Sequence, residues 1–289
     1  MDELDTLASR FEGHRPRLRA IAYRMLGSLS DAEDAVQEAW LRLSGTAYGE
    51  VDNLSAWLTT VTVRLSLNTL RSRKTRSETY MPDPIIDSAA GTSPEHAALL
   101  ANTIGMALQV VLETLAPAER VAFVLHDIFG MPFDEIAPIV ERTPDAARQL
   151  ASRARRRVQA RKVATDDDVA AQRSAVDAFV AAVQDGDLQR LIAVLDPDVI
   201  LRSDGVAASD RLIEVRGAER VGRGAISFSF PGLVRVPVLV NGAAGLVCTV
   251  EGKRFSVLAF TVREGRIAEI DILRDPERLG QLDLAVLDG

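Results

Sequence analysis

The spacing of apolar residues changes its period once along the chain, near Thr165, and this change limits the fold more than any other feature. Before it, apolar residues recur at i, i+3 and i+4, as in Leu18, Ile21 and Ala22, which predicts amphipathic helices. After it, one amphipathic helix is predicted, with Val176, Phe179, Val180 and Val183 facing inward. Strand-like apolar runs follow over 236–240, 244–250, 255–262 and 267–273, separated by turn pairs that are typical of hairpins, namely Asn241-Gly242, Glu251-Gly252 and Glu264-Gly265. The sequence therefore predicts helical segments followed by an α+β domain with a curved antiparallel sheet.

A proline-containing stretch divides the helical part in two. Residues 77–94 hold three prolines and show no sustained periodicity, so we interpret them as a linker. With 289 residues and 47% hydrophobic content, the chain is long enough for two or three domains. The predicted organisation is a helical domain over 1–76, the linker over 77–94, a second helical domain over 95–163 and the α+β domain over 166–289.

Three helices are expected in the first domain. The first ends near Gly27, the second runs from Asp31 to about Leu43, and the third runs from about Leu54 to Arg73. Ser30 and Glu33 have the spacing of a capping box for the second helix. The residues expected to face inward are Ala32, Ala35, Val36, Ala39, Trp40 and Leu43 on the second helix, and Trp57, Leu58, Val61 and Leu65 on the third.

The second domain contains the strongest motif of the sequence, a helix-turn-helix. Residues 133–140 predict one helix, Glu141-Arg142 a short bend, and Pro144 to about Val158 a second helix. Pro138 lies inside the first helix, where we expect a local bend. The residues expected to pack the two helices together are Ile136, Ala137, Val140, Ala147, Leu150, Ala151 and Ala154. The side chains left outside this packed face are Arg148, Gln149, Ser152, Arg155 and Arg156, which suit contacts with base edges and phosphates. A solvated arginine-rich face on an ordinary helical hairpin is the alternative.

Charge is distributed unevenly along the chain. The net charge is −7, yet residues 1–76 sum to +1 and residues 166–289 to −6. Within residues 141–162, eight basic residues stand against two acidic ones, a local basic surface of the kind that phosphate contacts require. The acidic total therefore does not exclude a nucleic-acid partner.

Two further polar faces lie in the first domain. An acidic ridge on the second helix suits either solvent or a basic partner, and its members are Asp31, Asp34, Gln37 and Glu38. On the third helix, Arg64, Asn68 and Arg71 recur at i, i+4 and i+7, and Arg73 and Lys74 follow. Cationic groups and an amide in this spacing favour binding of a single nucleic-acid strand.

Together these segments resemble the extracytoplasmic-function sigma factors of the sigma-70 family over about residues 5–162. Asp31-Ala-Glu-Asp-Ala-Val-Gln-Glu-Ala-Trp-Leu41 is similar to the helix that binds core RNA polymerase, and the resemblance implies that the acidic ridge docks on the largest subunit. It implies that the third helix melts and reads the −10 promoter element and that the helix-turn-helix reads the −35 element. The implied partners are core RNA polymerase, through its largest and second-largest subunits, and promoter DNA. A separate anti-sigma factor is permitted but not required.

The C-terminal domain resembles the cone-shaped SnoaL-like (NTF2-like) domain that is fused to one subgroup of these factors. Tyr80-Met-Pro-Asp-Pro84 and Arg274-Asp-Pro-Glu-Arg-Leu279 look like two signatures of that subgroup, and Asp204-Gly205 keeps only the start of a third. The resemblance implies that the domain modulates the factor. The residues expected to take part are Tyr80, Pro82, Asp83, Pro84, Asp204, Gly205, Asp275 and Pro276.

Two other functions compete with this interpretation. Cone-shaped domains also occur in isomerases and cyclases, so an enzyme or a small-molecule sensor is the alternative interpretation of residues 166–289. Every histidine, tyrosine and tryptophan lies before this domain, which leaves carboxylates such as Asp204, Asp271 and Asp275 as candidate acids or bases. We therefore predict no enzyme, cofactor or metal. A closed apolar pocket with an abnormally titrating carboxylate would favour the rival. A DNA-binding regulator that never touches polymerase would leave the acidic ridge unexplained.

The expected location is the cytoplasm. The first residues are acidic and are not followed by the apolar run of a signal peptide, and no stretch of about 18 apolar residues occurs. Cys248 is the single cysteine, so no internal disulfide forms, and we expect it to be buried in a strand.

Overall fold

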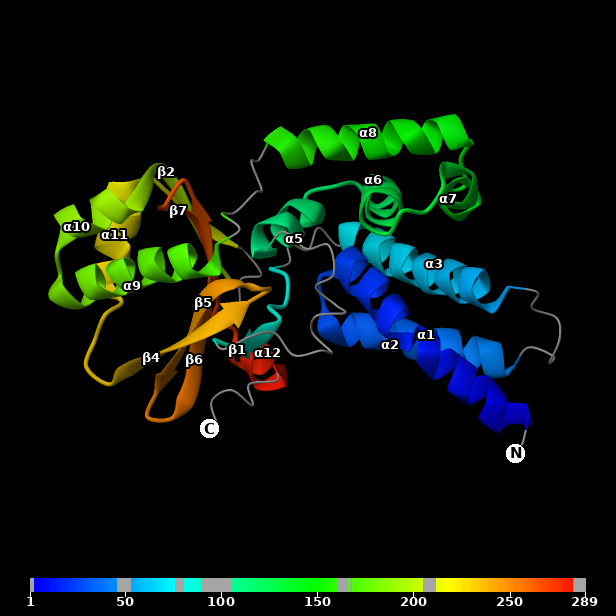
Figure 1. Ribbon diagram of the computed structural model, residues 1–289, viewed down its shortest axis with the longest axis horizontal. Helices are drawn as coiled ribbons and strands as arrows, with labels where there is room; N and C mark the ends of the chain where they lie inside the picture. Colours follow the sequence, from blue (N-terminus) through cyan, green and yellow to red (C-terminus); the bar gives the residue numbers. More distant parts are fainter. Residues whose placement is uncertain are drawn as a thin grey trace. The chain divides into compact units, whose positions relative to one another are not determined.

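The computed structural model describes residues 3–45, 53–75, 81–89, 105–160, 166, 168–204 and 212–282. The chain divides into two compact units (Figure 1). We call one the helical unit, which comprises Met1–Glu78, Ala97–Asn102 and Val111–Lys162. We call the other the sheet unit, which comprises Thr79–His96, Thr103–Val110 and Val163–Gly289.

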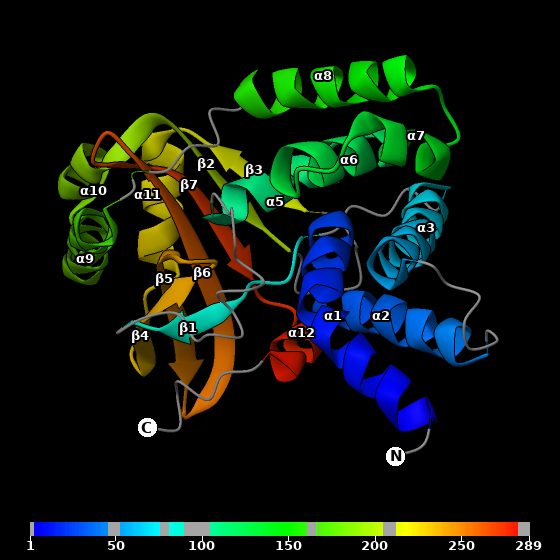
Figure 2. The same ribbon diagram turned by 45° about the vertical axis from the view of Figure 1, so that its right-hand side comes forward.

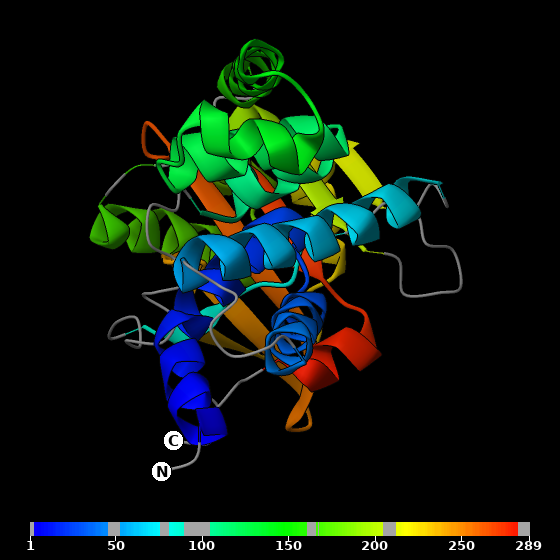
Figure 3. The same cartoon turned by 90° about the vertical axis from the view of Figure 1, so that its right-hand side faces the viewer.

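Within the described residues, the helical unit contains eight elements, and it shares one of them, α5, with the sheet unit. In Figures 1 and 3, α6 and α7 lie between α8 and the group formed by α1, α2 and α3. The elements are α1 (Glu3–Leu26), α2 (Leu29–Ser44), α3 (Leu54–Thr75), the second half of α5 (Gly105–Glu113), α6 (Pro117–Phe123), the π-helical turn η1 (Val124–Ile128), α7 (Phe133–Val140) and α8 (Pro144–Ala160).

The break between α1 and α2 differs in detail from the prediction. Gly27 ends α1 with a φ of 68°, and Ser28 then takes an extended backbone as the N-cap of α2. The Ser28 hydroxyl oxygen accepts a hydrogen bond from the Asp31 amide at 3.2 Å. The predicted capping box of Ser30 and Glu33 is therefore wrong, because the N-cap lies two residues earlier, at Ser28, and the Glu33 carboxylate pairs with Arg15 instead.

The packing of α2 confirms the prediction, whereas that of α3 corrects it. On α2 the predicted inward residues are buried, except that Trp40 is half-buried and packs on Phe11 with ring centroids 5.1 Å apart. On α3, Leu58 is buried as predicted, but Trp57, Val61 and Leu65 are only half-buried. Because α3 contacts α1, α2 and α6, its buried face is wider and shifted, and includes Val63, Leu67 and Leu70.

The helix-turn-helix has the predicted bounds, with α8 extended to Ala160. Glu141 takes the left-handed conformation, with a φ of 57°, so the bend forms without glycine. The residues expected to pack the two helices together are all buried, and α7 continues through Pro138. They are Ile136, Ala137, Val140, Ala147, Leu150, Ala151 and Ala154.

A buried arginine joins the two parts of the helical unit. Arg120 on α6 is 1% exposed, and its guanidinium pairs with Glu113 at 2.7 Å. Its Nε and Nη2 atoms also donate to the carbonyl oxygen of Arg24, at the end of α1, both at 3.2 Å. Since a buried charge is costly unless it is paired and hydrogen-bonded, these contacts fix α6 against α1.

The sheet unit contains one seven-stranded sheet in the order β1-β4-β5-β6-β7-β2-β3, and every pair is antiparallel except β2 with β7. Figure 2 shows α9, α10 and α11 together on one face of this curved sheet. The strands are β1 (Ile86–Ser88), β2 (Leu195–Ser203), β3 (Ile213–Arg216), β4 (Leu233–Val240), β5 (Ala243–Val250), β6 (Lys253–Arg263) and β7 (Arg266–Leu273). The helices are α9 (Val169–Asp185), α10 (Leu188–Val194), α11 (Ala218–Ser227) and α12 (Pro276–Gln281).

Four strands of the sheet were predicted, and three were not. The turn pairs at 241–242, 251–252 and 264–265 all have positive φ at both residues, which is the hairpin geometry that the sequence indicates. β2 and β3 were missed, as was the parallel pairing of β2 with β7. β1 is the larger surprise, because it comes from the segment interpreted as a linker and pairs with β4.

Two cores lie on opposite faces of the sheet. The core under α9 includes Val176, Phe179 and Val183, which the sequence placed inward, while Val180 is half-buried. The other core contains strand residues of β4 to β7, together with residues of β1, α5 and α12 and of the chain next to β1 and α12, namely Met81, Ile86, Met106, Val110, Leu279 and Leu282. Cys248 is a free thiol buried in β5, as predicted.

Gly245 in β5 is a test of this packing. A Cβ atom there would lie 2.3 Å from Val240 Cγ2 and 2.8 Å from the Leu258 carbonyl oxygen. Gly245→Ala should therefore lower the free energy of unfolding of the sheet unit by about 1–3 kcal/mol. Gly224→Ala is the matched control, since a Cβ atom there meets nothing within 4 Å. Urea unfolding followed by circular dichroism measures both, and equal midpoints would contradict the packing described.

Candidate functional site

The acidic ridge of α2 divides into exposed and paired members. Asp34 and Gln37 are exposed, and Glu38 is partly exposed and pairs with Arg42 at 3.0 Å. Asp31 is different, because its carboxylate pairs with Arg73 on α3. The Arg73 guanidinium also donates to the Leu26 carbonyl oxygen at 2.7 Å, so this ion pair joins α3 to the junction of α1 and α2.

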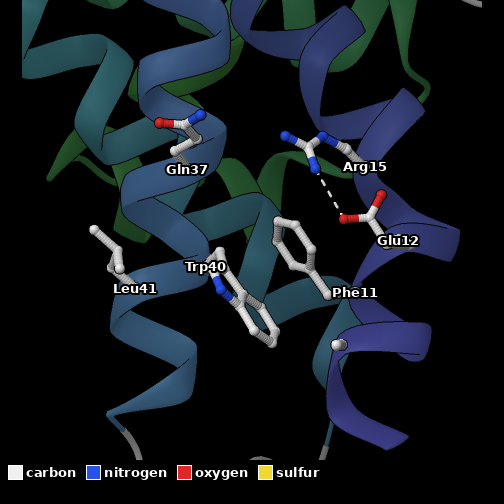
Figure 4. A pocket seen from close by; sticks show the side chains of 7 residues that line it. Phe11, Glu12, Arg15, Gln37, Trp40 and Leu41 are labelled. Atoms are coloured by element: carbon white, nitrogen blue, oxygen red, sulfur yellow. Dashed lines mark hydrogen bonds and ion pairs between the residues drawn. The ribbon is translucent and has the colours of Figure 1, made fainter. Parts of the chain in front are cut away.

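A groove of about 440 Å³ lies beside the ridge, between α1 and α2 (Figure 4). Phe11 and Trp40 face one another in it, while Leu41 and Gln37 extend from α2. Leu41 is 62% exposed, which is unusual for a large apolar side chain next to a packed core. The lining residues are Ala8, Phe11, Glu12, Arg15, Gln37, Trp40 and Leu41.

The sequence interpretation did not name this apolar part of the surface. Asp34, Gln37 and Leu41 recur at i, i+3 and i+7, so they share one exposed face of α2. The available signal was that Leu41 falls outside the buried stripe of Ala32, Val36, Ala39 and Leu43. An apolar residue on the polar side of an amphipathic helix is a candidate contact.

The basic face of α3 is present as predicted, except at Arg73. Arg64, Asn68 and Arg71 are exposed in a row, and Lys74 is exposed one turn further on. Within the described part of the chain, none of these four side chains has a recorded ion pair or hydrogen bond. Arg73 is half-buried and held by Asp31, so it stands apart from this row.

On α8, the predicted outward side chains fall into two groups. Gln149, Ser152 and Arg156 are exposed and have no recorded partner among the described residues. Arg148 pairs with Asp145 and lies over the Phe133 ring at 5.4 Å, and Arg155 pairs with Asp127.

Two further arginines of α8, which the sequence did not single out, have an internal role. Arg153 and Arg157 both bind the buried Glu119 carboxylate of α6, at 2.9 and 3.0 Å. Glu119 is 6% exposed, so two cations stabilise a carboxylate that would otherwise be buried without compensation. These contacts hold α8 on α6 and leave its opposite side outward.

The motifs of the sheet unit meet at one arginine. Arg278 on α12 pairs through its guanidinium with Asp83 and also donates to the Met81 carbonyl oxygen. Asp204 accepts hydrogen bonds from the amides of Arg274 at 2.6 Å and Asp275 at 3.2 Å. A second Arg278 nitrogen lies 3.8 Å from Asp204 Oδ2.

The other predicted members surround this network. Asp275 caps α12 by accepting from the Arg278 amide at 2.9 Å, and Pro276 is the first residue of that helix. Pro82 and Pro84 are buried beside Asp83. Tyr80 and Gly205 lie outside the described residues. Three sequence motifs that are far apart in the chain are thus brought together.

Asn241 adds a second attachment of the same segment. The Asn241 amide donates to the Ile85 carbonyl oxygen at 2.7 Å, and the Ile85 amide donates to Asn241 Oδ1 at 2.9 Å. Asn241 is 2% exposed and is also the first residue of a hairpin turn. The turn between β4 and β5 therefore fixes the residue that precedes β1.

A pocket of about 470 Å³ opens on the helix-covered face of the sheet, lined largely by apolar residues. It holds one carboxylate, Asp204, whose pKa is raised above its ordinary value by burial. Both Asp204 oxygens already accept backbone hydrogen bonds, so the carboxylate is committed to structure. Phe228 at the rim is 56% exposed, so the pocket is open rather than closed.

The two other candidate carboxylates do not serve this pocket. Asp275 caps α12, and Asp271 lies between Ile270 and Ile272, which line the pocket, so it points to the opposite face of β7. Neither residue lines the cavity. Among the described residues, no group of three histidine, cysteine, aspartate or glutamate side chains is placed to bind a metal ion.

Asp271 belongs to a buried ionic cluster around Arg202. The Arg202 guanidinium binds Glu269 at 2.7 Å and Asp271 at 3.0 Å, and Arg202 is 2% exposed. Asp271 Oδ2 has no hydrogen-bond partner. Burial raises the pKa of Asp271 to about 6, although the Arg202 guanidinium opposes this shift, and the nearby Glu269 carboxylate adds to it.

Comparisons with known proteins follow the same division of the chain. Residues 10–76 match the family model of Sigma-70 region 2, and residues 105–158 match that of Sigma-70, region 4. The ECF RNA polymerase sigma factor SigJ of Mycobacterium tuberculosis is 38% identical over 288 residues, which cover 93% of this chain and 92% of that protein.

The similarity extends through the sheet unit. The probable ECF RNA polymerase sigma factor SigI of the same organism is 36% identical over 98% of both chains. The crystal structure of the extracytoplasmic function sigma factor SigJ of Mycobacterium tuberculosis superposes with a TM-score of 0.77 and 36% identity, over 96% of this chain and 99% of that one. Among the helices described, none combines the length and the apolar character needed to cross a bilayer.

Asp271 makes the stability of the sheet unit depend on pH. Because its pKa is raised on folding, its ionisation opposes folding, and stability is lost as pH rises from about 4 through 6. Asparagine cannot ionise, so the free energy of unfolding of Asp271→Asn should rise relative to that of the natural protein by up to about 3 kcal/mol between pH 4.5 and 8. Urea unfolding at several pH values measures the difference. Asp177→Asn, an exposed control on α9, should show no such trend, and a flat difference for Asp271→Asn would contradict the assignment.

Proposed function

The chain belongs to the extracytoplasmic-function sigma factors, which bind core RNA polymerase and promoter DNA to direct transcription initiation, and from this premise we propose which surface performs each step. The observation that supports the proposal is that one helical unit carries three separate exposed polar faces. They are an acidic and apolar face on α2, a basic face on α3 and a second basic face on α8. The working location of such a factor is the cytoplasm.

Core polymerase docks on α2, at Asp34, Gln37, Glu38 and Leu41. The two carboxylates supply attraction to a basic partner, and exposed Leu41 next to the Phe11–Trp40 groove supplies apolar area for a side chain of that partner. We assign this surface to the largest polymerase subunit, as the resemblance of α2 to the polymerase-binding helix of the family implies. Asp31 contributes indirectly, since its ion pair with Arg73 sets the position of α2 against α3.

The basic face of α3 binds the unpaired −10 strand. Arg64, Arg71 and Lys74 follow one side of the helix and supply charge for successive phosphates, while the Asn68 amide can donate to and accept from a base edge. None of these side chains has to break an internal contact recorded in the described residues before it binds. Arg73 does have such a contact, and we assign it to structure rather than to DNA.

The outward side of α8 enters the major groove of the −35 element. Arg148 is held over the Phe133 ring and beside Asp145, which fixes its direction before binding. Such a positioned guanidinium suits bidentate contact with guanine, and Gln149 suits adenine. Arg156 is exposed and has no recorded partner in the described chain, which suits a phosphate contact.

The sheet unit modulates the factor through the segment between the two helical parts. Residues 81–88 connect α3 with α5, yet they are held in the sheet by Arg278 and Asn241 and by the pairing of β1 with β4. A segment held in a sheet cannot extend freely, so this attachment limits how far the α3 and α8 faces can separate when the Arg120 contacts between α6 and α1 are broken. Catalysis is not part of the proposal, because the pocket carboxylate is committed to backbone hydrogen bonds.

Charge reversal on α2 tests the docking surface. Asp34→Arg should weaken binding to core polymerase at least about tenfold and lower run-off transcription in parallel, because it places like charge against a basic partner. Leu41→Ser should weaken binding without changing charge. Asp177→Arg reverses an exposed carboxylate on α9 and is the control. Unchanged transcription by Asp34→Arg, with the fold intact, would refute the docking assignment.

Substitutions on α8 separate base reading from phosphate binding. Arg148→Ala should reduce the free energy of binding to the preferred −35 sequence by about 1–3 kcal/mol and have little effect on binding to other sequences. Arg156→Ala should weaken binding to all sequences alike and lower the slope of log affinity against log salt concentration by about one. Holoenzyme binding to promoter fragments at several salt concentrations measures both. Arg153→Gln is the comparison, since this side chain binds Glu119. Equal losses from Arg148→Ala on every sequence would make Arg148 a phosphate contact.

Arg278→Gln tests modulation without removing the sheet unit. Deletion of 166–289 would leave β1 without its partner strand, so a point change is cleaner. We expect the variant to raise run-off transcription by core polymerase, because the segment that connects α3 with α5 is released. Arg266→Gln changes an exposed arginine of β7 and is the control. Unchanged transcription would contradict a modulating role of the sheet unit. A decrease would show that the attachment of residues 81–88 supports transcription and does not restrain it.

A further inference from the structure

We propose that the pocket of the sheet unit binds a small amphipathic acid, an organic anion with an apolar body, and that this ligand acts on residues 81–88 through Arg274 and Asp204. The site and its ligand class go beyond the function proposed above, which assigns the pocket no role. The inference rests on the lining of the cavity, on its uncompensated positive charge and on the contacts that join its rim to the linker.

The wall of the pocket favours an apolar body. Its volume of about 470 Å³ lies within the range of roughly 300–1,000 Å³ that is usual for small-molecule sites. Phe179, Val221 and Ile270 are nearly fully buried and form the floor, while Phe228 and Phe255 lie at the more exposed side. Aromatic and branched side chains of this kind bind hydrocarbon or ring surface.

The charges of the pocket favour an anion. Three arginines line it, Arg220, Arg235 and Arg274, against the single carboxylate of Asp204. Across the described ranges, none of the three has a recorded carboxylate partner. Arg235 donates to the Ser229 hydroxyl at 3.0 Å, and Arg274 lies over the rings of Phe228 and Phe255 at 4.9 and 5.1 Å. Arg235 and Arg274 are partly buried, whereas Arg220 is exposed at the edge of the pocket, and partly buried guanidinium groups in an apolar cavity are stabilised by a bound anion.

A row of hydrogen-bond donors crosses the sheet at the same place. Arg235 on β4 lies directly opposite Cys248 on β5, and Cys248 lies opposite Ser256 on β6. All three line the pocket, and Cys248 and Ser256 are each 4% exposed. A guanidinium, a thiol and a hydroxyl side by side can donate to one carboxylate group. A cationic ligand has no equivalent partner, since both Asp204 oxygens are occupied.

The rim of the pocket is joined to the linker by a short chain of contacts. The Arg274 side chain lies on the pocket rings, and its amide donates to Asp204 Oδ1 at 2.6 Å. A nitrogen of the Arg278 guanidinium lies 3.8 Å from the Asp204 carboxylate. The same guanidinium binds the Asp83 carboxylate and donates to the Met81 carbonyl oxygen. An anion that draws Arg274 inward therefore shifts the loop that positions the Arg278 contacts.

Calorimetric titration of the full chain with decanoate tests the ligand class. We expect one molecule of decanoate to bind per chain, with decan-1-ol at least about tenfold weaker and decylamine without detectable binding. Arg235→Gln should weaken decanoate at least tenfold, and Arg235→Lys should retain most of the affinity because it keeps the charge. Arg223→Gln, on the same helix as Arg220 but paired with Glu219 and outside the pocket, is the matched control. Equal binding of the acid and the alcohol would overturn the anion site, as would no binding of decanoate.

Cys248 provides a readout that needs no substitution. It is the single cysteine of the chain, it lies in the pocket wall, and burial raises the pKa of its thiol, so its alkylation by iodoacetamide is slow. Decanoate should slow alkylation further, at least about threefold, in native buffer. An unchanged rate at saturating decanoate would place the bound acid elsewhere and overturn the proposal.

Hydrogen exchange tests the coupling. Decanoate should change the exchange rates of the residue 81–88 amides at least about threefold in the natural chain, and Asp204→Asn should reduce that change. Binding of decanoate without any change at residues 81–88 would overturn the coupling while leaving the pocket assignment and the sigma-factor function intact. These functions are therefore separately testable.

Discussion

The guanidinium of Arg278 is the interaction on which the organisation of the sheet unit depends. It binds the Asp83 carboxylate and the Met81 carbonyl of one segment while its own helix is capped by Asp275 and its loop is held by Asp204. The Arg278 and Asp83 side chains are only 20% and 12% exposed, so their attraction is screened less than that of a surface pair. Removal of either partner would leave the other partly buried charge less well compensated.

This contact changes what the segment between the helical parts is. A free tether would let the α3 and α8 faces move independently, whereas a segment that contributes a strand to another unit transmits the state of that unit. Residues 81–88 and the pocket lie on opposite faces of the same sheet. Residues 81–88 pack into the core that contains Val238 and Leu273, and the pocket opens on the face that α9 and α11 cover. One short segment, from Arg274 to Arg278 at the start of α12, contacts both the pocket and residues 81–88.

The sequence predicts local structure well where the signal is local. The helix-turn-helix, the α2 packing and the three hairpin turns all follow from periodicity or turn residues within a few positions, and all are present. The predictions were wrong or incomplete where a partner far away in the sequence determines the structure. β1 has three residues and gains its role only from β4, about 150 residues later, and the Asp31–Arg73 pair joins positions 42 residues apart. Neither arrangement leaves a pattern in a single sequence.

The most direct test of this account is the exchange of backbone amides in residues 85–88 of the full chain. If the segment is part of the sheet, these amides should exchange about as slowly as those of β4 and β5, and Arg278→Gln should speed them selectively. If they exchange at the rate of an unstructured peptide in the natural chain, the segment is a free tether and the proposed modulation through Arg278 is wrong.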